Sequence, residues 1–164
     1  MPIFKNLSQL TSMNFNALEQ EQWDQLEDNL VHVDHRDDED GLIKVIAESL
    51  QLYLKCHWEE DTLLVTYRSQ HYVIPLTFTP HNHYVTISSI ALLLNYAFTF
   101  WVAHNSLEND THSLVILINN LSKQLKKTHQ LWLIKNLVKL ELGFDYFYSI
   151  KIPYLHNKKN APDF

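Results

Sequence analysis

The chain contains two glycines, five prolines and one cysteine among its 164 residues, and each shortage excludes a class of protein. Gly41 and Gly143 lie too far apart to form a P-loop or a Gly-x-Gly-x-x-Gly turn, so we expect no nucleotide and predict that the protein needs no cofactor. The lone thiol, Cys56, cannot form an intramolecular disulfide. Together with the lack of a secretory signal in residues 1–5, it predicts a cytoplasmic protein.

Long apolar runs are also missing. The longest, residues 85–103, is interrupted by five Ser, Thr and Asn residues and changes its period midway, unlike a membrane span of about 20 apolar residues. We therefore expect no membrane segment and no membrane partner. A hydrophobic content of 46% is sufficient for one buried core. We predict a single domain over residues 1–164, with a frayed tail at 154–164.

Charge is divided unequally along the chain. Residues 1–61 hold fourteen Asp and Glu against four Lys and Arg, whereas residues 62–164 hold five against nine. The net charge is therefore −10 in the first part and +4 in the second, or −6 overall. Such asymmetry indicates either a charged partner or two parts of the molecule that neutralise each other, because the summed field steers encounters without choosing a fold.

The first third of the chain has helical periodicity. Asn16 and Glu19 are spaced like a capping box and predict a helix over residues 17–30. A wide apolar stripe that begins after Asp40 predicts a second helix, which we expect to end near Cys56.

The period then falls to two. Residues 62–67 and 71–78 are rich in β-branched and aromatic side chains, and predict a hairpin with residues 68–70 as its turn. Because Pro75 has no backbone N–H to donate, the second strand must be an edge strand or be bulged there.

The rest of the chain alternates between the two periods. We expect a short helix over residues 88–95 with Thr86 as its cap, strands over 96–103 and 113–118, a long helix over 120–142 and a last strand over 146–152. The long helix is expected to bury its apolar side chains, Leu121, Leu125, Leu131, Ile134, Val138 and Leu142. This order predicts an α+β fold, with a mainly antiparallel sheet of about five strands and helices packed on it.

The middle third of the chain resembles a group of small uncharacterised bacterial proteins. The resemblance is carried by Ile74-Pro75-Leu76-Thr77 through Tyr84-Val85-Thr86-Ile87, and by Ser106-Leu107-Glu108-Asn109-Asp110-Thr111-His112. It implies a bacterial origin, and brings neither an activity nor a ligand.

The ten histidines make a metal site one hypothesis. His81 and His83 lie on the same side of an extended segment, and Asp110 and His112 can supply a carboxylate and a third nitrogen. Two histidines and a carboxylate with open positions form a recurrent catalytic metal site. This pattern supports a small metal-dependent hydrolase as an alternative function. The competing interpretation is that Asp110 and His112 only shape a loop.

Nucleophilic catalysis needs a Cys or Ser beside a base. Ser106, Asp110 and His112 have the residue types of a triad within one loop, but no glycine-rich elbow accompanies them. Ser113 is a further candidate nucleophile. Cys56 is interpreted as a small buried hydrophobic residue. These patterns favour a protein that is not an enzyme.

Five lysines line the polar side of the predicted long helix, and allow a second alternative function, binding of nucleic-acid phosphates. They are Lys123, Lys126, Lys127, Lys135 and Lys139. The scarcity of arginine and the acidic overall charge favour an ordinary solvated helix face instead, so we do not expect nucleic acid as a partner.

Carboxylates in the first part of the chain are the candidate partner-binding residues. They are Asp34, Asp37, Asp38, Glu39, Asp40, Glu59, Glu60 and Asp61. Clustered carboxylates can meet a cationic surface and speed association, or can serve only for solubility. The leading hypothesis is a non-catalytic bacterial interaction protein that binds a basic protein through this acidic surface, as a toxin-neutralising immunity protein or another inhibitor does. The sequence leaves the oligomeric state open.

Overall fold

The computed structural model describes residues 30–141 and 143–151. The elements in this part of the chain are β1 (Val31–Asp34), α3 (Glu39–Leu50), β2 (Leu54–Glu59), β3 (Thr62–Tyr67), β4 (Gln70–Val73), α4 (Asn82–Leu93), β5 (Phe98–Ala103), a short 3-10 helix (His104–Ser106), β6 (Thr111–Ile118), α5 (Asn119–Thr128), α6 (Gln130–Asn136), β7 (Leu137–Lys139), β8 (Phe144–Asp145) and β9 (Ile150–Lys151). The helix predicted over residues 17–30 and the tail at 154–164 lie outside the described residues.

A four-stranded antiparallel sheet has the order β1-β6-β5-β7. Its inner strand β6 is buried from His112 to Leu117, so both of its faces are covered. This confirms the prediction from the continuous apolar run at residues 113–118, because a strand packed on both sides does not need to alternate. β5 is its other inner strand, and it too is buried on both faces.

A three-stranded antiparallel sheet has the order β2-β3-β4. The predicted hairpin is confirmed in β3 and β4, with Arg68 and Ser69 at φ 50° and 63° in the turn between them. Two successive residues with positive φ are typical of a tight hairpin turn whose twist matches its strands. β4 ends at Val73, two residues before Pro75, and it is an edge strand, as Pro75 requires.

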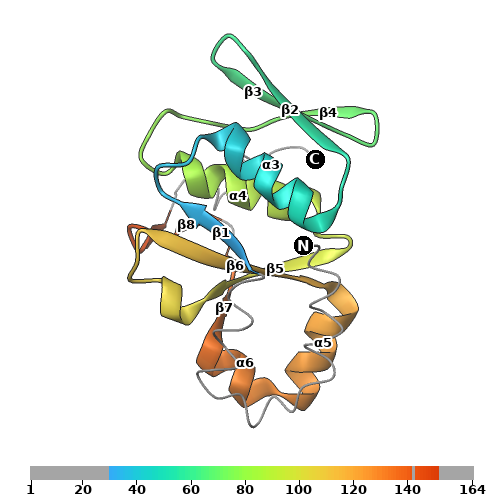
Figure 1. The fold of residues 1–164 in the computed structure, drawn as a ribbon, viewed down its shortest axis with the longest axis vertical. Coiled ribbons are helices and arrows are strands. Elements are labelled where there is room, and N and C mark those ends of the chain that lie inside the picture. The colour runs from blue at the N-terminus through green and yellow to red at the C-terminus, as the bar shows by residue number, and fades with distance from the viewer. Residues whose placement is uncertain (1–29, 142, 152–164) are drawn as a thin grey trace.

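Two helices separate these sheets. Figure 1 shows α3 and α4 side by side, with the three-stranded sheet above them and the four-stranded sheet below. α3 places Leu42, Ile43 and Ile46 on its buried face. α4 is buried from Tyr84 to Ile90, including the polar residues between them, because it has neighbours on every side. The main core therefore lies around α4.

The second predicted helix ends earlier than expected. α3 stops at Leu50, and Gln51 adopts a left-handed conformation with φ 53°. The backbone N–H of Leu52 then donates to the carbonyl of Ala47, which closes the helix end. Residues 54–59 form β2 and not a continuation of the helix, because their hydrogen bonds go to β3.

The short helix predicted over residues 88–95 is longer and begins earlier, at Asn82. Thr86, the expected cap, lies inside the helix and is fully buried. The apolar periodicity missed the first turn because α4 is buried on all sides, and such a helix has no polar face to reveal its period.

The long helix predicted over residues 120–142 is wrong. The chain forms α5 and α6, separated at His129 with φ −137°, and then the strand β7. Leu121 and Leu125 are buried as predicted, whereas Leu131 and Ile134, which were also expected to be buried, are 85% and 60% exposed. β7 pairs with β5, whose edge needs hydrogen-bond partners. The periodicity could not reveal this pairing, because Leu137 and Val138 suit a helix and a strand equally.

The last predicted strand, residues 146–152, is also different. β8 and β9 form a two-stranded hairpin, and Tyr146 lies in the turn between them. The expected α+β class is nevertheless confirmed: antiparallel strands, divided among sheets of four, three and two, have helices packed on them. No helix in the described ranges is long and apolar enough to cross a membrane.

Candidate functional site

Two acidic segments that are separate in the sequence meet at one end of the molecule. The first follows β1 and enters α3, and the second forms the turn between β2 and β3. Trp58, next to that turn, donates its indole N–H to Oδ1 of Asp40 at 3.4 Å. The Sγ of Cys56 lies 3.6 Å from the carbonyl oxygen of Asp40. These contacts hold β2 against the first turn of α3.

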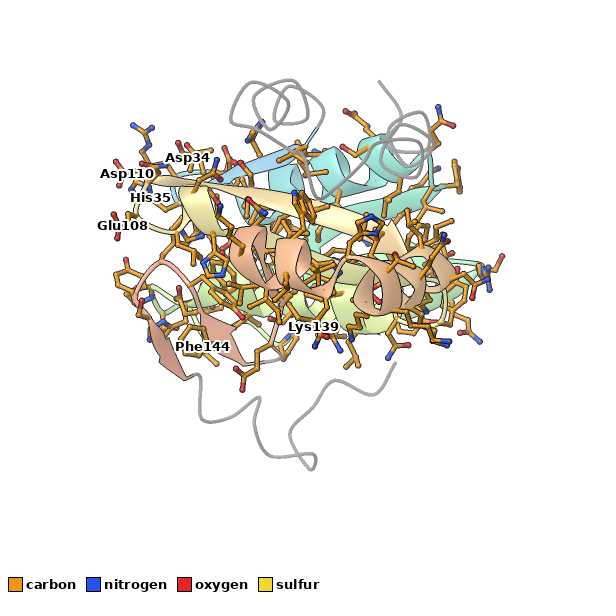
Figure 2. All side chains as sticks on the ribbon, turned by 90° about the horizontal axis from the view of Figure 1, so that it is seen from below. Asp34, His35, Glu108, Asp110, Lys139 and Phe144 are labelled. Carbon is orange, nitrogen blue, oxygen red and sulfur yellow. The ribbon has the colours of Figure 1, made fainter. Side chains whose placement is uncertain are left out.

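The structure adds two carboxylates, Glu108 and Asp110, to the predicted partner-binding residues; the sequence suggested Asp110 only as a metal ligand. The backbone N–H of His35 donates to the carbonyl of Asp110 at 3.2 Å, so the loop before β6 lies beside the acidic loop. Figure 2 shows Asp34, His35, Glu108 and Asp110 gathered at one edge. We call the eight predicted carboxylates, together with Glu108 and Asp110, the acidic face. The pairing of β1 with β6 brings the loop of Glu108 and Asp110 beside the loop after β1, although the two loops are about 75 residues apart in the sequence.

Arg36 neutralises part of this face. Its guanidinium donates two hydrogen bonds to the carboxylate of Asp34, each at 2.9 Å, and its backbone N–H donates a third. Thr111 donates to the same carboxylate at 3.2 Å. The hydrogen bonds from Arg36 hold the pKa of Asp34 well below its usual range. Asp34 is therefore a structural anchor of the loop.

Three more predicted carboxylates have internal partners. Oδ2 of Asp37 accepts the backbone N–H of Asp34 at 2.7 Å. Lys44 donates to Asp40 at 2.8 Å, and this hydrogen bond lowers the pKa of Asp40 although partial burial opposes the shift.

Glu39 binds a histidine. Its Oε1 lies 2.8 Å from Nδ1 of His83, and both side chains are mostly buried. Burial disfavours the charged imidazolium, but the hydrogen bond and charge of Glu39 outweigh it and raise the pKa of His83. The pair fastens α3 to α4, so Glu39 contributes to the fold more than to an open surface.

The remaining carboxylates of the acidic face are exposed. Within the described ranges, no hydrogen bond or ion pair reaches the side chains of Asp38, Glu60, Asp61, Glu108 or Asp110. Glu59 lies 3.2 Å from the Nε2 of exposed His57. These outward carboxylates are the groups that can meet a partner without breaking an internal contact.

The predicted metal ligands are not brought together. Nδ1 of His81 is 2.8 Å from Asp145, and Nδ1 of His112 is bonded to the hydroxyl of Tyr84. His83 is held by Glu39, as described above, and the side chain of Asp110 is exposed. Across the described part of the chain, no group of three or more His, Cys, Asp or Glu side chains could hold a metal ion.

Several histidines pack instead around Phe147. The ring of His112 stacks on that of Phe147 with centroids 3.9 Å apart. His35 and His83 make edge contacts with the same ring at 6.0 and 6.4 Å. Burial lowers the pKa of His112, so it is neutral in this environment. Three of the ten histidines thus serve aromatic packing around Phe147.

Asp145 is a buried carboxylate that sequence analysis missed. Its Oδ1 accepts the backbone N–H groups of Phe147 and Tyr148, and its Oδ2 is 2.8 Å from His81. The side chain is 1% exposed. A His–Asp pair can orient a base, but nucleophilic catalysis also needs a suitable Ser or Cys in contact with that base. Here the pair closes the turn between β8 and β9.

The candidate nucleophiles have structural contacts. Ser106 donates to the carbonyl of Ala103 at 2.7 Å and accepts the backbone N–H of Ser113 at 2.9 Å. The hydroxyl of Ser113 is 2.9 Å from Nδ1 of His32. Burial raises the pKa of the Cys56 thiol, which disfavours the reactive thiolate.

No protein-family model matches the sequence, and no curated protein or solved structure matches it significantly. The likeness of the middle third to small bacterial proteins gains no support from these comparisons. The functional argument therefore rests on the residues and their arrangement.

Proposed function

We propose that the protein is a non-catalytic interaction protein whose acidic face binds a basic macromolecule. The observation that carries this proposal is that contacts link three chain segments, after β1, after β2 and before β6: Trp58 binds Asp40, and His35 binds the loop at Asp110. Each brings outward carboxylates, and the cations among them are Arg36 and Lys44, each bound to one carboxylate. The face is therefore strongly negative.

The lysines of α5, α6 and β7 lie far from the turn between β2 and β3. In Figure 1 these elements occupy the bottom of the view and that turn the top, and the loop before β6 lies between them. Within the described residues, the exposed carboxylates of the β2–β3 turn are therefore separated in space from these lysines. Salt screens the field of an exposed charge over about 8 Å at physiological ionic strength. The lysines at the bottom of the view therefore weaken the attraction of a basic protein to the β2–β3 turn very little.

A basic protein is the expected kind of partner, because complementary charge raises association rates and fixes orientation. A toxin whose active surface is cationic is one such protein, and neutralising it requires no catalysis. Finding a gene for a toxin or nuclease directly upstream of the gene for this chain would support that more specific role.

Affinity capture from the source organism tests the proposal. The bait proteins are the wild type, the variant Asp38→Asn/Glu60→Gln/Asp61→Asn, and the control Glu48→Gln/Glu141→Gln. The first variant changes exposed carboxylates of the acidic face, and the control changes exposed carboxylates outside it. We expect a basic protein to be retained by wild type and control and lost from the variant. Identical captured proteins on all three baits contradict the proposal.

A further inference from the structure

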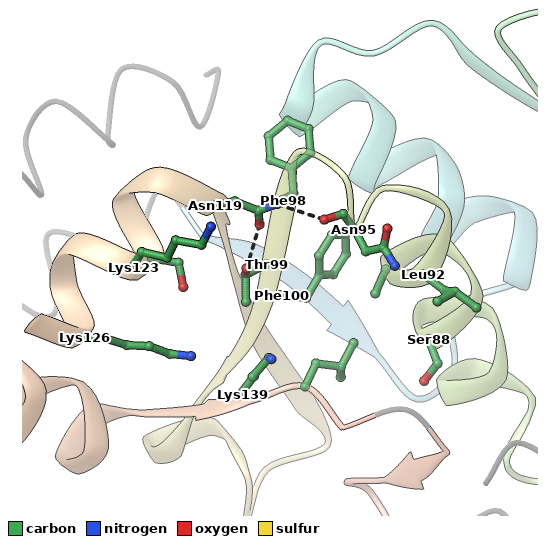
Figure 3. A pocket seen from close by; sticks show the side chains of 13 residues that line it. Ser88, Leu92, Asn95, Phe98, Thr99, Phe100, Asn119, Lys123, Lys126 and Lys139 are labelled. Carbon is green, nitrogen blue, oxygen red and sulfur yellow. Dashed lines mark hydrogen bonds between the residues drawn. The ribbon is translucent and has the colours of Figure 1, made fainter. Parts of the chain in front are cut away.

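A cavity of about 390 Å³ lies between α4, β5, α5 and β7, away from the acidic face (Figure 3). Three lysines line it: Lys123 and Lys126 from α5, and Lys139 from β7. The volume is in the range of sites that bind small molecules. All three lysines lie in residues 120–142, which the sequence predicts to be one helix, so the cavity depends on the break at His129.

Among the described residues, no carboxylate compensates the positive charge of the cavity. None of its lining residues is acidic, and no carboxylate in the described part of the chain forms an ion pair with the three lysines, although the ammonium of Lys126 lies 5.6 Å from the centre of the Trp101 ring. In Figure 3 Lys123 and Lys126 reach toward the cavity from α5 at the left, and Lys139 reaches toward it from β7 below. Like charges around a shared cavity repel, and a bound anion removes that repulsion.

Polar groups in the walls are placed to accept or donate further hydrogen bonds. Ser88 is fully buried in the wall, and its hydroxyl has no hydrogen-bond partner among the described residues. An unpartnered buried hydroxyl is costly, so a polar group that reached it would be stabilised. Asn119 and Ser122 bring the first turn of α5 to the cavity. The backbone N–H of Asn119 donates to the carbonyl of Ala97 at 2.9 Å, but Ile118 at the cap position has no side-chain acceptor for the amides that follow, so this turn favours negative charge.

Hydrogen bonds hold the cavity open. The side chain of Asn119 accepts from Thr99 at 2.8 Å and donates to the carbonyl of Asn95 at 2.8 Å. These bonds, drawn in Figure 3, fasten the start of α5 to β5 and to the end of α4. The elements that carry the lysines thus have a fixed relative position, so little conformational entropy is lost in arranging the site when a ligand binds.

Aromatic side chains form the other part of the wall. Phe98 and Phe100 from β5 line the cavity, together with Leu92 and Leu140. A bare inorganic ion makes no use of these surfaces, whereas an organic molecule with one charged end can contact lysines and rings at once.

We propose that this cavity binds a small organic anion, with a phosphate or carboxylate at the lysines and an apolar or aromatic body against Phe98 and Phe100. Nucleic acid fits less well. Lys127 and Lys135, the other exposed lysines of α5 and α6, do not line the cavity, and neither arginine of the chain does. A nucleic-acid surface typically combines a continuous basic stripe with arginine.

Calorimetric titration of the full chain with phenyl phosphate, benzoate, inorganic phosphate, benzyl alcohol and a single-stranded oligonucleotide tests the site. The variant Lys123→Gln/Lys139→Gln removes two cavity charges. The control Lys127→Gln/Lys135→Gln removes the same charge from exposed positions outside the cavity. All three proteins are first compared by circular dichroism and Tm, so that a folding defect is not read as lost binding.

We expect phenyl phosphate or benzoate to bind wild type and control more tightly than inorganic phosphate or benzyl alcohol does. The cavity variant should bind at least about tenfold more weakly, because each charge-assisted hydrogen bond contributes on the order of tenfold or more. The preferred probe identifies the charged group. Three results overturn the proposal: no binding by either organic anion, equal weakening in both variants, or tighter binding of a single-stranded oligonucleotide that both variants weaken equally.

Discussion

The indole N–H of Trp58 donates to the carboxylate of Asp40 at 3.4 Å, and this contact joins two acidic segments that are eighteen residues apart. It places the turn with Glu59, Glu60 and Asp61 next to the first turn of α3. The acidic face is therefore a product of the tertiary fold, in which a half-exposed aromatic side chain sets the distance between two carboxylate clusters.

The Glu39–His83 pair predicts a pH dependence. Because the pKa of His83 is raised, the pair stabilises the fold fully below the ordinary histidine pKa of about 6.5, and this contribution is lost as the pH rises through the raised value. Glu39→Gln should lower the pKa of His83, since it removes the charge of Glu39, while burial still disfavours the charged imidazolium. The Tm difference from wild type should be larger at pH 5.5 than at pH 8.

An NMR titration of the His83 ring measures the shift directly. Glu59→Gln is the matched control, because its partner His57 is exposed and such pairs contribute little to stability. An unchanged pKa of His83 in Glu39→Gln contradicts the assignment.

Removing the hydroxyl of Tyr84 should destabilise the protein. Tyr84 and His112 are both fully buried, and Tyr84→Phe leaves Nδ1 of His112 without its partner. We expect a loss of about 1–3 kcal/mol in the free energy of unfolding, measured by urea denaturation. Tyr148→Phe removes an exposed hydroxyl and should change it by less than about 0.5 kcal/mol. Equal effects of the two substitutions are incompatible with this account.

Two buried serines should respond differently to substitution by alanine. Ser106→Ala leaves the carbonyl of Ala103 and the N–H of Ser113 without partners, and should cost about 1–3 kcal/mol. Ser88→Ala removes a hydroxyl without a partner in the described residues, and should be neutral or slightly stabilising. Thermal unfolding of the two variants checks the contrast. A large loss from Ser88→Ala means that its hydroxyl has a structural partner.

Sequence periodicity predicted the fold class and the hairpin well, because these depend on local patterns. β3 and β6 are close to their predicted ranges: one alternates, and the other is uniformly apolar. The prediction of one long helix over residues 120–142 was wrong because residues 137–139 pair with the open edge of β5, about 35 residues away in the sequence. Local apolar spacing contains no information about such an edge.

The candidate site was predictable in part. The charge count pointed to the carboxylates that carry the acidic face, but Glu108 joins them only through the neighbourhood of β1 and β6. The histidines at 81, 83 and 112 were interpreted as ligands because spacing cannot show that Asp145, Glu39 and Tyr84 bind them individually. Buried polar partners from distant segments are the part that one sequence does not reveal.

The break in the predicted long helix can be tested with two leucines. Leu133 is 3% exposed and Leu131 is 85% exposed, although a continuous helix was expected to bury Leu131. Leu133→Asp should cost at least about 3 kcal/mol, because it removes a core side chain and buries a charge. Leu131→Asp should change the free energy of unfolding by less than about 0.5 kcal/mol. A severe loss from Leu131→Asp shows that this residue is covered.

The salt dependence of association with the captured basic partner tests the acidic face most directly. The measured quantity is the association rate constant between low salt and about 0.3 M salt, for wild type, Asp38→Asn/Glu60→Gln/Asp61→Asn and the Glu48→Gln/Glu141→Gln control. The proposal predicts a steep fall with salt for wild type and control, and a slower, flatter dependence for the variant, because salt screens only the charges that steer the encounter. Equal rate constants and equal salt slopes for all three proteins contradict it.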